Sequence, residues 1–414
     1  MVSIRGSVSA VVGSAVAALV STTVIVAQDA APRPVFRAGV DVIEVDVQVI
    51  GRDGAPVLDL KPEQFDVRIG GQRRRVASAQ MIRYGDASLL ASAPATAAPG
   101  EVVEGLTPAE AMAGRRLFMI AVDALSFDAG DSRGVAVATQ RFIEQLPPTD
   151  LVGLFTFPSG PKVDPTTEHA EVVRALDEVT GQRVITRGRF ALQASEVVDY
   201  IASESEQGPI IQRHCGAPPD PGCVSVLDSE IRTLGGTFEA MAQSSLGMLR
   251  DMMEELGKVP GRKILVLASA GLPVSDRPGG RPGIGDLPER LGETAARGHI
   301  SIYSLFVDHS MLRAFASEEA NARRQMVNVS RESNLLGRWL DQFSGTSGGT
   351  MIKVMVDSGE TAYAQIARET SVHYLLAIEP DRSDRSGSSR RIQVRVDARN
   401  ATVRARQLVV LPEE

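Results

Sequence analysis

An uninterrupted apolar run in the middle of the chain constrains the fold most. Residues 117–122 read LFMIAV, without polar alternation, and lead directly into Asp123. A strand that is apolar on both faces is typical of a parallel sheet covered by helices on both sides. Ligands of such sheets bind at the carboxyl ends of the strands, which is where Asp123 falls. The sequence therefore predicts an α/β layer with a candidate site at Asp123.

Strand-like and helix-like patterns alternate along the segment that begins with this run. Further strands are expected at residues 151–157, 264–267, 300–307 and 351–356, and helices at 134–146, 170–179, 225–256, 335–343 and 363–368. Apolar residues recur at helical spacing in the expected helices, which gives each of them one face to bury. This alternation predicts a Rossmann-like doubly wound α/β domain over residues 115–370.

Three stretches interrupt the alternation. Residues 181–224 are predicted to be an insertion that is irregular except for a helical pattern at 195–203. The pair Gly235-Gly236 is a candidate break in the longest helical pattern, because glycine is a poor helix former. The glycine-rich residues 344–349 are expected to end the helix that precedes them.

Antiparallel β patterns flank the predicted α/β domain. The first part, residues 34–84, has strand signals at 40–49, 57–60, 65–69 and 75–82, and Gly70-Gly71 is the expected hairpin turn between the last two. The second part, residues 371–412, has strand signals at 373–379, 391–397 and 402–410. Because three strands alone are a weak domain, they are expected to complete an antiparallel β-sandwich of about seven strands with the first part. The α/β domain would then be inserted in, or flanked by, this sandwich.

Two polar or low-complexity stretches lie at the end of the first β part and directly after it. The three consecutive arginines at 73–75 are interpreted as a solvated edge or turn, with an anion-binding patch as the alternative. Residues 85–114 are rich in Ala, Pro, Ser and Gly, and they are predicted to be a linker.

The N-terminal segment has the pattern of an export signal. Arg5 supplies a positive start, residues 6–27 carry no charge, and small residues lead to a plausible cleavage point after Ala27. Residues 1–27 are therefore predicted to be a signal peptide, with an uncleaved N-terminal anchor as the alternative. The predicted location is secreted or periplasmic, with no membrane span after cleavage. In such a compartment the chain's two cysteines, Cys215 and Cys223, are expected to form a local disulfide rather than remain idle thiols.

The net charge and the aromatic content indicate which kinds of partner the chain is expected to bind. The formal net charge is −7 and aromatic residues make up 4% of the chain. A mildly acidic chain has no electrostatic attraction for nucleic acid or anionic membrane, and few aromatic side chains are available to stack on bases. A protein partner in the envelope or extracellular space is the remaining expectation, and nucleic acid is not expected.

Several segments, in their order, resemble the VWFA-related domain family of secreted bacterial proteins. The matching segments are VDVIEVDVQVIGRDGAPVLDLKPEQFDVRIGG near the start, RRLFMIAVDALS, DLVGLFTF and GRKILVLASAG in the middle, and ISIYSLFVD, HYLLAIEP and RRIQVRVDA towards the end. The resemblance implies a von Willebrand factor type A fold flanked by Ig-like β structure. It also implies an extracytoplasmic location and a role in adhesion or protein assembly, and it does not imply an enzyme.

Type A domains typically hold Mg²⁺ at a metal-ion-dependent adhesion site, and the matching motif is incomplete here. That site needs D-x-S-x-S after the first strand, a threonine from a later loop and an aspartate after a later strand. Asp123 holds the first position, but Leu125 and Phe127 stand at the serine positions and Ala270 at the second aspartate position. Mg²⁺ prefers a near-octahedral shell of hard oxygens, so these losses are expected to weaken binding greatly.

A rearranged oxygen set is the alternative for a metal. Ser126 and Asp128 stand one residue out of frame and could act with Asp123, and Thr166, Thr167 and Thr237 are candidates for the threonine. The main interpretation is a degenerate site, in which Asp123 caps the turn or the helix that follows. No cofactor is therefore expected, and Mg²⁺ is kept only as the alternative.

The sequence thus predicts a protein-binding or adhesion-type module that uses loops at the carboxyl ends of the sheet. A structural envelope component that assembles through its β-sandwich is the second hypothesis. A hydrolase is the minor alternative, because LASAG, which contains Ser269, resembles the G-x-S-x-G motif but lacks its first glycine.

Overall fold

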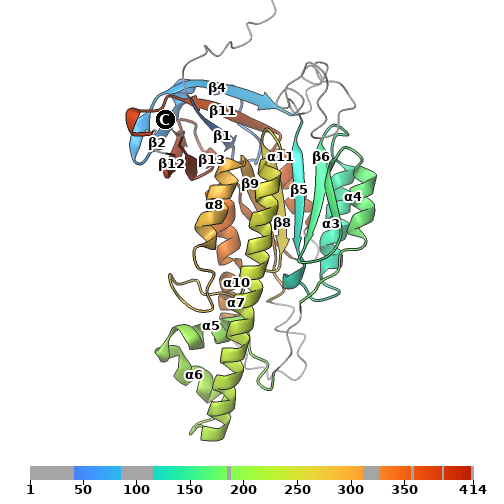
Figure 1. Cartoon of the computed structure of the whole chain (residues 1–414), viewed down its shortest axis with the longest axis vertical. Helices are drawn as coiled ribbons and strands as arrows, with labels where there is room; N and C mark the ends of the chain where they lie inside the picture. Colours follow the sequence, from blue (N-terminus) through green and yellow to red (C-terminus); the bar gives the residue numbers. More distant parts are fainter. Residues whose placement is uncertain are drawn as a thin grey trace, which may run out of the picture. The chain divides into compact units, whose positions relative to one another are not determined.

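A computed structural model describes residues 42–84, 115–183, 188–310, 326–355, 359–384 and 387–411. The predicted signal peptide and the predicted linker at 85–114 lie outside these residues. The described chain is mixed α/β, with one six-stranded mixed sheet and two four-stranded antiparallel sheets (Figure 1). This confirms an α/β fold with added antiparallel β structure.

The six-stranded sheet has the order β10-β9-β8-β5-β6-β7. Its strands are β5 (Leu117–Asp123), β6 (Leu151–Phe157), β7 (Lys162–Thr166), β8 (Lys263–Ser269), β9 (Ile300–Val307) and β10 (Met351–Val354). All neighbouring pairs are parallel except β6 and β7, which are antiparallel. Every residue of β5, β8 and β9 is buried, as their apolar runs predict. Strand β7 was not predicted, because KVDPT carries little apolar signal.

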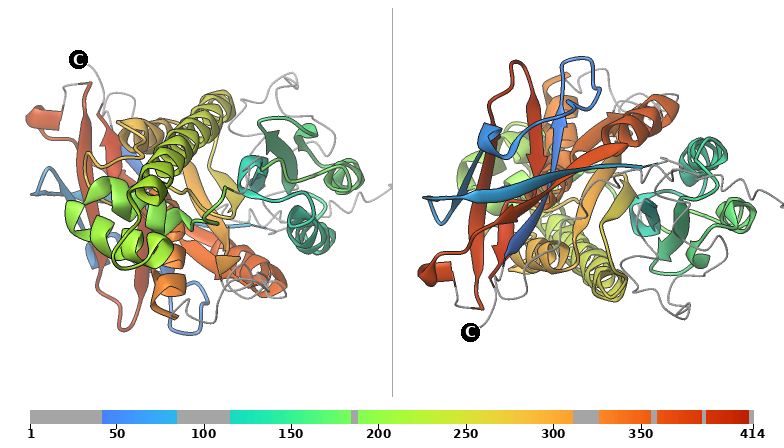
Figure 2. Two further views of the ribbon diagram at one scale, coloured as in Figure 1. Left: turned by 90° about the horizontal axis from the view of Figure 1, so that it is seen from below. Right: turned by 90° about the horizontal axis from the view of Figure 1, so that it is seen from above.

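Helices cover both faces of this sheet, because successive side chains of β5 point to opposite sides (Figure 2). Phe118 and Ile120 pack with α3 (Ser132–Glu144), α4 (His169–Leu176) and α11 (Gly359–Glu369). Leu117 and Met119 belong to the core that includes α7 (Pro221–Gly257), α8 (Leu287–Arg297) and α10 (Met326–Ser347).

Two predicted helix ends were wrong. Helix α7 is continuous over 37 residues and passes through Gly235-Gly236 without a break. Gly235 is buried, and a Cβ there would lie 2.5 Å from Ile201 Cδ1, so this glycine allows a second helix to approach closely. Helix α10 continues through Gly345 and ends at Ser347, where Gly348, with φ +87°, takes the left-handed conformation.

The segment at 181–224 is more regular than the sequence predicted. It contains α5 (Ala194–Ala202), as expected, and α6 (Glu204–Cys215), whose polar composition hid its helical pattern. Cys215 and Cys223 form the predicted disulfide, which joins the end of α6 to the first turn of α7. In Figure 1, α5, α6 and the first part of α7 lie together, away from the central sheet.

The two antiparallel sheets combine strands from both sides of the α/β segment. One has the order β13-β1-β11-β4 and the other β14-β12-β2-β3. The strands are β1 (Ile43–Ile50), β2 (Phe65–Ile69), β3 (Gln72–Arg74), β4 (Val76–Arg83), β11 (Val372–Ile378), β12 (Ser389–Val396), β13 (Thr402–Ala405) and β14 (Leu408–Val410). Residues of both sheets share one apolar core, which includes Val45, Val67, Tyr374, Leu376 and Ile392.

The hairpin predicted between residues 65–69 and 75–82 is wrong. Strand β2 turns at Gly70-Gly71 into the short β3, and the chain then leaves for the other sheet, where β4 pairs with β11. Residues 57–60 form no strand, and only Pro56 makes an isolated bridge, to Ile50. The expected turn before β2 is present as the 3-10 helix η1 (Pro62–Gln64).

Arg74 contradicts the interpretation of residues 73–75 as a solvated run. Its side chain is 6% exposed and pairs with the fully buried Asp384 of the 3-10 turn η3 (Arg382–Asp384). Nε and Nη2 donate to the two carboxylate oxygens at 2.6 and 2.9 Å. Arg73 and Arg75, on either side, are exposed as expected.

Candidate functional site

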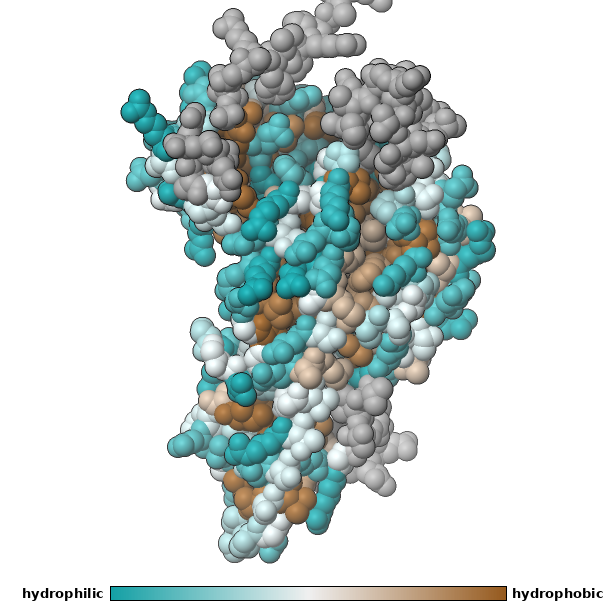
Figure 3. All heavy atoms as spheres, in the orientation of Figure 1, coloured by the Kyte–Doolittle hydropathy of each residue, from teal (hydrophilic) through white to brown (hydrophobic). Residues whose placement is uncertain are grey.

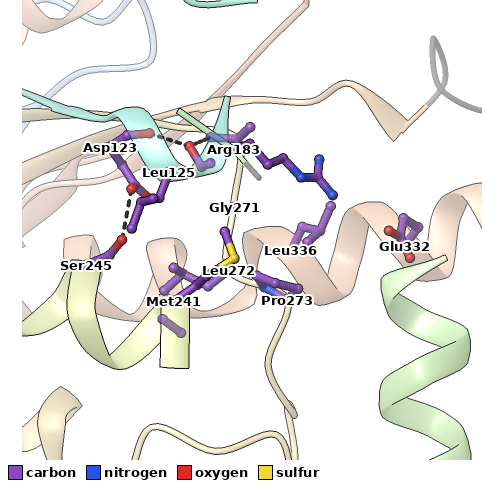
Figure 4. Close-up of a pocket in the computed structure, with 13 residues that line it drawn as sticks. Asp123, Leu125, Arg183, Met241, Ser245, Gly271, Leu272, Pro273, Glu332 and Leu336 are labelled. Carbon is purple, nitrogen blue, oxygen red and sulfur yellow. Dashed lines mark hydrogen bonds between the residues drawn. The ribbon is translucent and has the colours of Figure 1, made fainter. Parts of the chain in front are cut away.

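Asp123 is the last residue of β5 and is 3% exposed. Two serine hydroxyls from other elements donate to its carboxylate. Ser245, in the middle of α7, donates to Oδ1 at 3.0 Å, and Ser269, at the end of β8, donates to Oδ2 at 3.0 Å. Figure 4 shows the carboxylate turned inward towards Ser245. Both carboxylate oxygens are therefore already bound by protein groups.

Ser126 serves the backbone rather than the carboxylate. It ends the 3-10 turn η2 (Ala124–Ser126), and its hydroxyl donates to the carbonyl oxygen of Asp123 at 2.8 Å. The same hydroxyl accepts the amide of Ala270 at 2.8 Å. Ser126 thus fastens the turn after β5 to the end of β8. The backbone amides of Leu125 and Ser126, in this turn, also act on the Asp123 carboxylate and help to lower its pKa, although the side chain makes no N-cap hydrogen bond to η2.

The other candidate oxygens do not converge on Asp123. Asp128 is exposed and does not line the cavity beside Asp123. The hydroxyl of Thr166 accepts the amide of Glu168, and the hydroxyl of Thr237 donates to the carbonyl of Thr233 in its own helix. Across the described residues, no group of three or more His, Cys, Asp or Glu side chains could hold a metal ion.

A small cavity of about 30 Å³ adjoins the Asp123 carboxylate (Figure 4). Its walls combine the first residues after β8 with α7 and the start of α10, and they include Leu125, Met241, Gly271, Pro273, Glu332 and Leu336. This space is sufficient for water and too small for a substrate or a cofactor. The cavity therefore has room for a water molecule or a single ion beside the carboxylate, and not for an organic ligand.

Burial dominates the electrostatics of Asp123. It raises the pKa of the carboxyl from 3.8 to about 6, although the hydroxyls of Ser245 and Ser269 act in the opposite direction. A divalent cation beside the carboxylate would favour the ionised form. The hydroxyls and backbone amides that act on the carboxylate are neutral, and they offset only part of the cost of burying its charge.

Ser269 does not have the environment of a nucleophile. It is 1% exposed, and its hydroxyl donates to Asp123 and accepts the amide of Gly271 at 3.1 Å. A serine nucleophile needs a neighbouring base that accepts its proton, and the partner here is a buried carboxylate without an approach for substrate. The arrangement supports a structural task for Ser269, namely to hold the end of β8 against β5.

Hydrogen bonds and ion pairs join the segment at 181–224 to the edge of this site. Glu332, in α10, accepts the first amides of α5 from Ala194 at 3.1 Å and from Ser195 at 2.6 Å. The neighbouring Arg331 pairs with Asp199 of α5 and with Asp276 in the loop after β8. These links could not be predicted from the sequence, because their partners are up to 138 residues apart.

The loops at the carboxyl edge of the sheet differ in exposure. Residues 128–130 after β5 and Ser159-Gly160 after β6 are exposed, whereas most of 270–275 after β8 is buried. Exposed polar loops on a rigid sheet are a common place for binding. In the described parts of the chain, no helix is long and apolar enough to cross a membrane.

No protein-family model and no curated protein matches this chain. An aerotolerance-related membrane protein from Bacteroides fragilis is 13% identical, with a TM-score of 0.30 over 62% of this chain and 98% of that chain. The conserved hypothetical protein BatB from Bacteroides thetaiotaomicron is 10% identical, with a TM-score of 0.30 over 62% and 98%. Proximal thread matrix protein 1 from the mussel byssus is 7% identical, with a TM-score of 0.28 over 61% of this chain and 47% of that chain. Scores this low carry no conclusion about fold or family, so the type A assignment stays a prediction.

Proposed function

We propose that the chain is a secreted or periplasmic protein-binding module built on a type A domain whose metal site is degenerate. The observation that carries this proposal is the environment of the Asp123 carboxylate. Its carboxylate is buried, and it is bound by Ser245 and Ser269 where a metal would otherwise be ligated. In this proposal a protein partner is bound by the surface around Asp123 and not through a metal ion.

The partner-binding surface in this proposal is the exposed part of the carboxyl edge. It consists of residues 128–130 and Ser159-Gly160, whereas most of the loop after β8 is buried. Large exposed apolar side chains of the described chain, such as Leu58, Val137, Val226 and Met355, do not lie in these loops. On the face shown in Figure 3, hydrophilic and near-neutral residues dominate and apolar ones form scattered patches. A polar contact of moderate size fits these loops better than an apolar one.

Site-specific photo-crosslinking in envelope fractions tests this proposal. A crosslinking residue at Ala129 or Ser159 is expected to capture a protein partner, with or without a chelator. Matched positions on the outermost strands of the antiparallel sheets, Arg73 in β3 and Thr402 in β13, serve as controls.

Each outcome of this experiment has a distinct meaning. Crosslinks only at Arg73 or Thr402 would favour a structural component that assembles through its β-sheets, because outer strands present unpaired backbone groups. Crosslinks at Ala129 that disappear with chelator would contradict the degenerate metal site.

A further inference from the structure

A His–Asp–His cluster lies where the antiparallel sheet of β1 and β11 meets the amino ends of β8 and β9. Asp46 of β1 accepts from His299 Nδ1 through Oδ2 at 3.0 Å, and its Oδ1 lies 3.4 Å from His373 Nε2. His373 belongs to β11, whereas His299 immediately precedes β9. One carboxylate therefore connects the two sheets.

The backbone of His299 is unusual. Its φ of +50° lies in the left-handed region, which non-glycine residues rarely occupy. In this conformation its carbonyl accepts the amide of Lys263 at 2.9 Å while its ring faces Asp46. Strained backbone of this kind persists where its surroundings hold it in place, and it often marks a functional constraint.

Cations surround Asp46, so the cluster is not a metal site. Arg262, Lys263 and Arg406 all interact electrostatically with Asp46, and Glu44 is the additional acidic group facing Arg406. Burial lowers the pKa of Lys263 to about 8, and Asp46 acts in the opposite direction. Arg406 also donates to the carbonyls of Glu44 in β1 and Ala296 in α8. The charge balance favours an ionised Asp46 and disfavours any further cation.

His373 is the member of the cluster whose surroundings disfavour a second proton on the imidazole ring. It is 3% exposed, its ring stacks on Tyr84 at 5.4 Å, and Nε2 faces Asp46. Within the described residues, Nδ1 is buried and has no hydrogen-bond partner. A proton on Nδ1 would place both a charge and an unsatisfied N–H in this position, close to Arg262.

We propose that this cluster is a proton-sensitive joint: uptake of a proton by His373 at mildly acidic pH weakens the contact between the β1–β11 sheet and the central sheet. The inference concerns conformation and is independent of the proposed binding function. Tyr303 of β9, which donates to Gln48 of β1 at 2.8 Å, lies in the same contact and would loosen with it.

The pKa shifts of His373 and Asp46 show in which direction pH changes the stability of this contact. Burial lowers the pKa of His373 below 6.5, with Arg262 adding to this and Asp46 opposing it. His373 therefore contributes stability above pH 6.5 that is lost as the pH falls through its folded-state pKa. Burial alone would raise the pKa of Asp46, but hydrogen bonds from His299 and His373 hold it well below 3.8, so Asp46 stays ionised throughout the window of His373.

Amide hydrogen exchange at about pH 7.5 and about pH 5 tests the joint. Protection factors in β1 and at the start of β9 are expected to fall about tenfold on acidification, while those in α4 stay unchanged. In His373→Gln, whose amide can still donate to Asp46 but does not titrate, the acid response is expected to disappear. His169→Gln, on α4, is the matched control and is expected to keep the wild-type response.

Two results would contradict the proposal of a proton-sensitive joint. One is equal protection of β1 in the wild-type protein at both pH values, and the other is an unchanged acid response in His373→Gln. If that variant does not fold, NMR titration of the His373 ring in the wild-type protein decides the question. A midpoint below 6.5 is expected, and a midpoint at or above 6.5 would rule the joint out.

Discussion

Asp123→Asn is expected to stabilise the protein by about 2 kcal/mol at neutral pH, although it alters a buried, hydrogen-bonded residue. Burial raises the pKa of Asp123 from 3.8 to about 6. A carboxyl whose pKa rises on folding contributes stability that is complete below its unfolded pKa and is lost as the pH rises through its folded pKa. Above about pH 6 the wild-type protein therefore carries a buried charge, and the uncharged amide of asparagine removes it.

Denaturant unfolding at two pH values measures this effect. The difference between Asp123→Asn and wild type should be near zero at about pH 4, where Asp123 is protonated in the folded protein, and should reach its full size at about pH 7.5. Asp128→Asn, at an exposed carboxylate five residues later, is the control and should change stability little. Destabilisation of Asp123→Asn at neutral pH would contradict this prediction, because it would mean that a charged partner or the hydrogen bonds from Ser245 and Ser269 outweigh the cost of the buried charge.

Asp384→Ala is expected to have the largest destabilising effect, about 3–5 kcal/mol. The substitution leaves the guanidinium of Arg74 buried with its main partner removed, and an uncompensated buried charge is costly. Asp384 also accepts the amide of Asp381 at 3.0 Å, so η3 loses an anchor as well. Because the pair links β3 to the turn before β12, the melting temperature of the whole chain should fall.

Two further variants separate the buried charge from general disruption. Arg73→Ala removes an arginine that is 72% exposed, and it should cost less than about 1 kcal/mol. The double variant Arg74→Met/Asp384→Leu replaces both charges with apolar groups and should recover most of the lost stability. A double variant as unstable as Asp384→Ala would show that the ion pair itself, rather than the orphaned charge, holds this end of the sheet.

Continuous apolar runs predicted the central sheet because burial on both faces leaves a direct mark on the residues of β5, β8 and β9. The same reasoning located Asp123 at a strand end. Prediction from local sequence patterns failed where a residue's ion-pair or hydrogen-bond partner is distant in the chain. Arg74 looks like its exposed neighbours, and only the position of Asp384, 310 residues later, makes it a buried residue.

The candidate site shows the same limit. The resemblance to type A domains predicts that Leu125 and Phe127 stand at serine positions of the metal motif, because these positions follow β5 directly. It could not identify Ser245, which lies in the middle of a long helix and reaches Asp123 only because α7 passes beneath the end of β5. Glycines were misleading for a related reason: Gly235 permits close packing against Ile201 and does not end the helix.

Calorimetric titration of the protein with Mg²⁺ and Mn²⁺ tests the central claim most directly, namely that serine hydroxyls have replaced a metal at Asp123. Oxygen sites bind these ions through several carboxylates and hydroxyls, and here the Asp123 carboxylate is already bound by Ser245 and Ser269. No saturable heat is expected with either ion at neutral pH, in wild type or in Asp123→Ala. Micromolar binding by the wild-type protein that is lost in Asp123→Ala would contradict it.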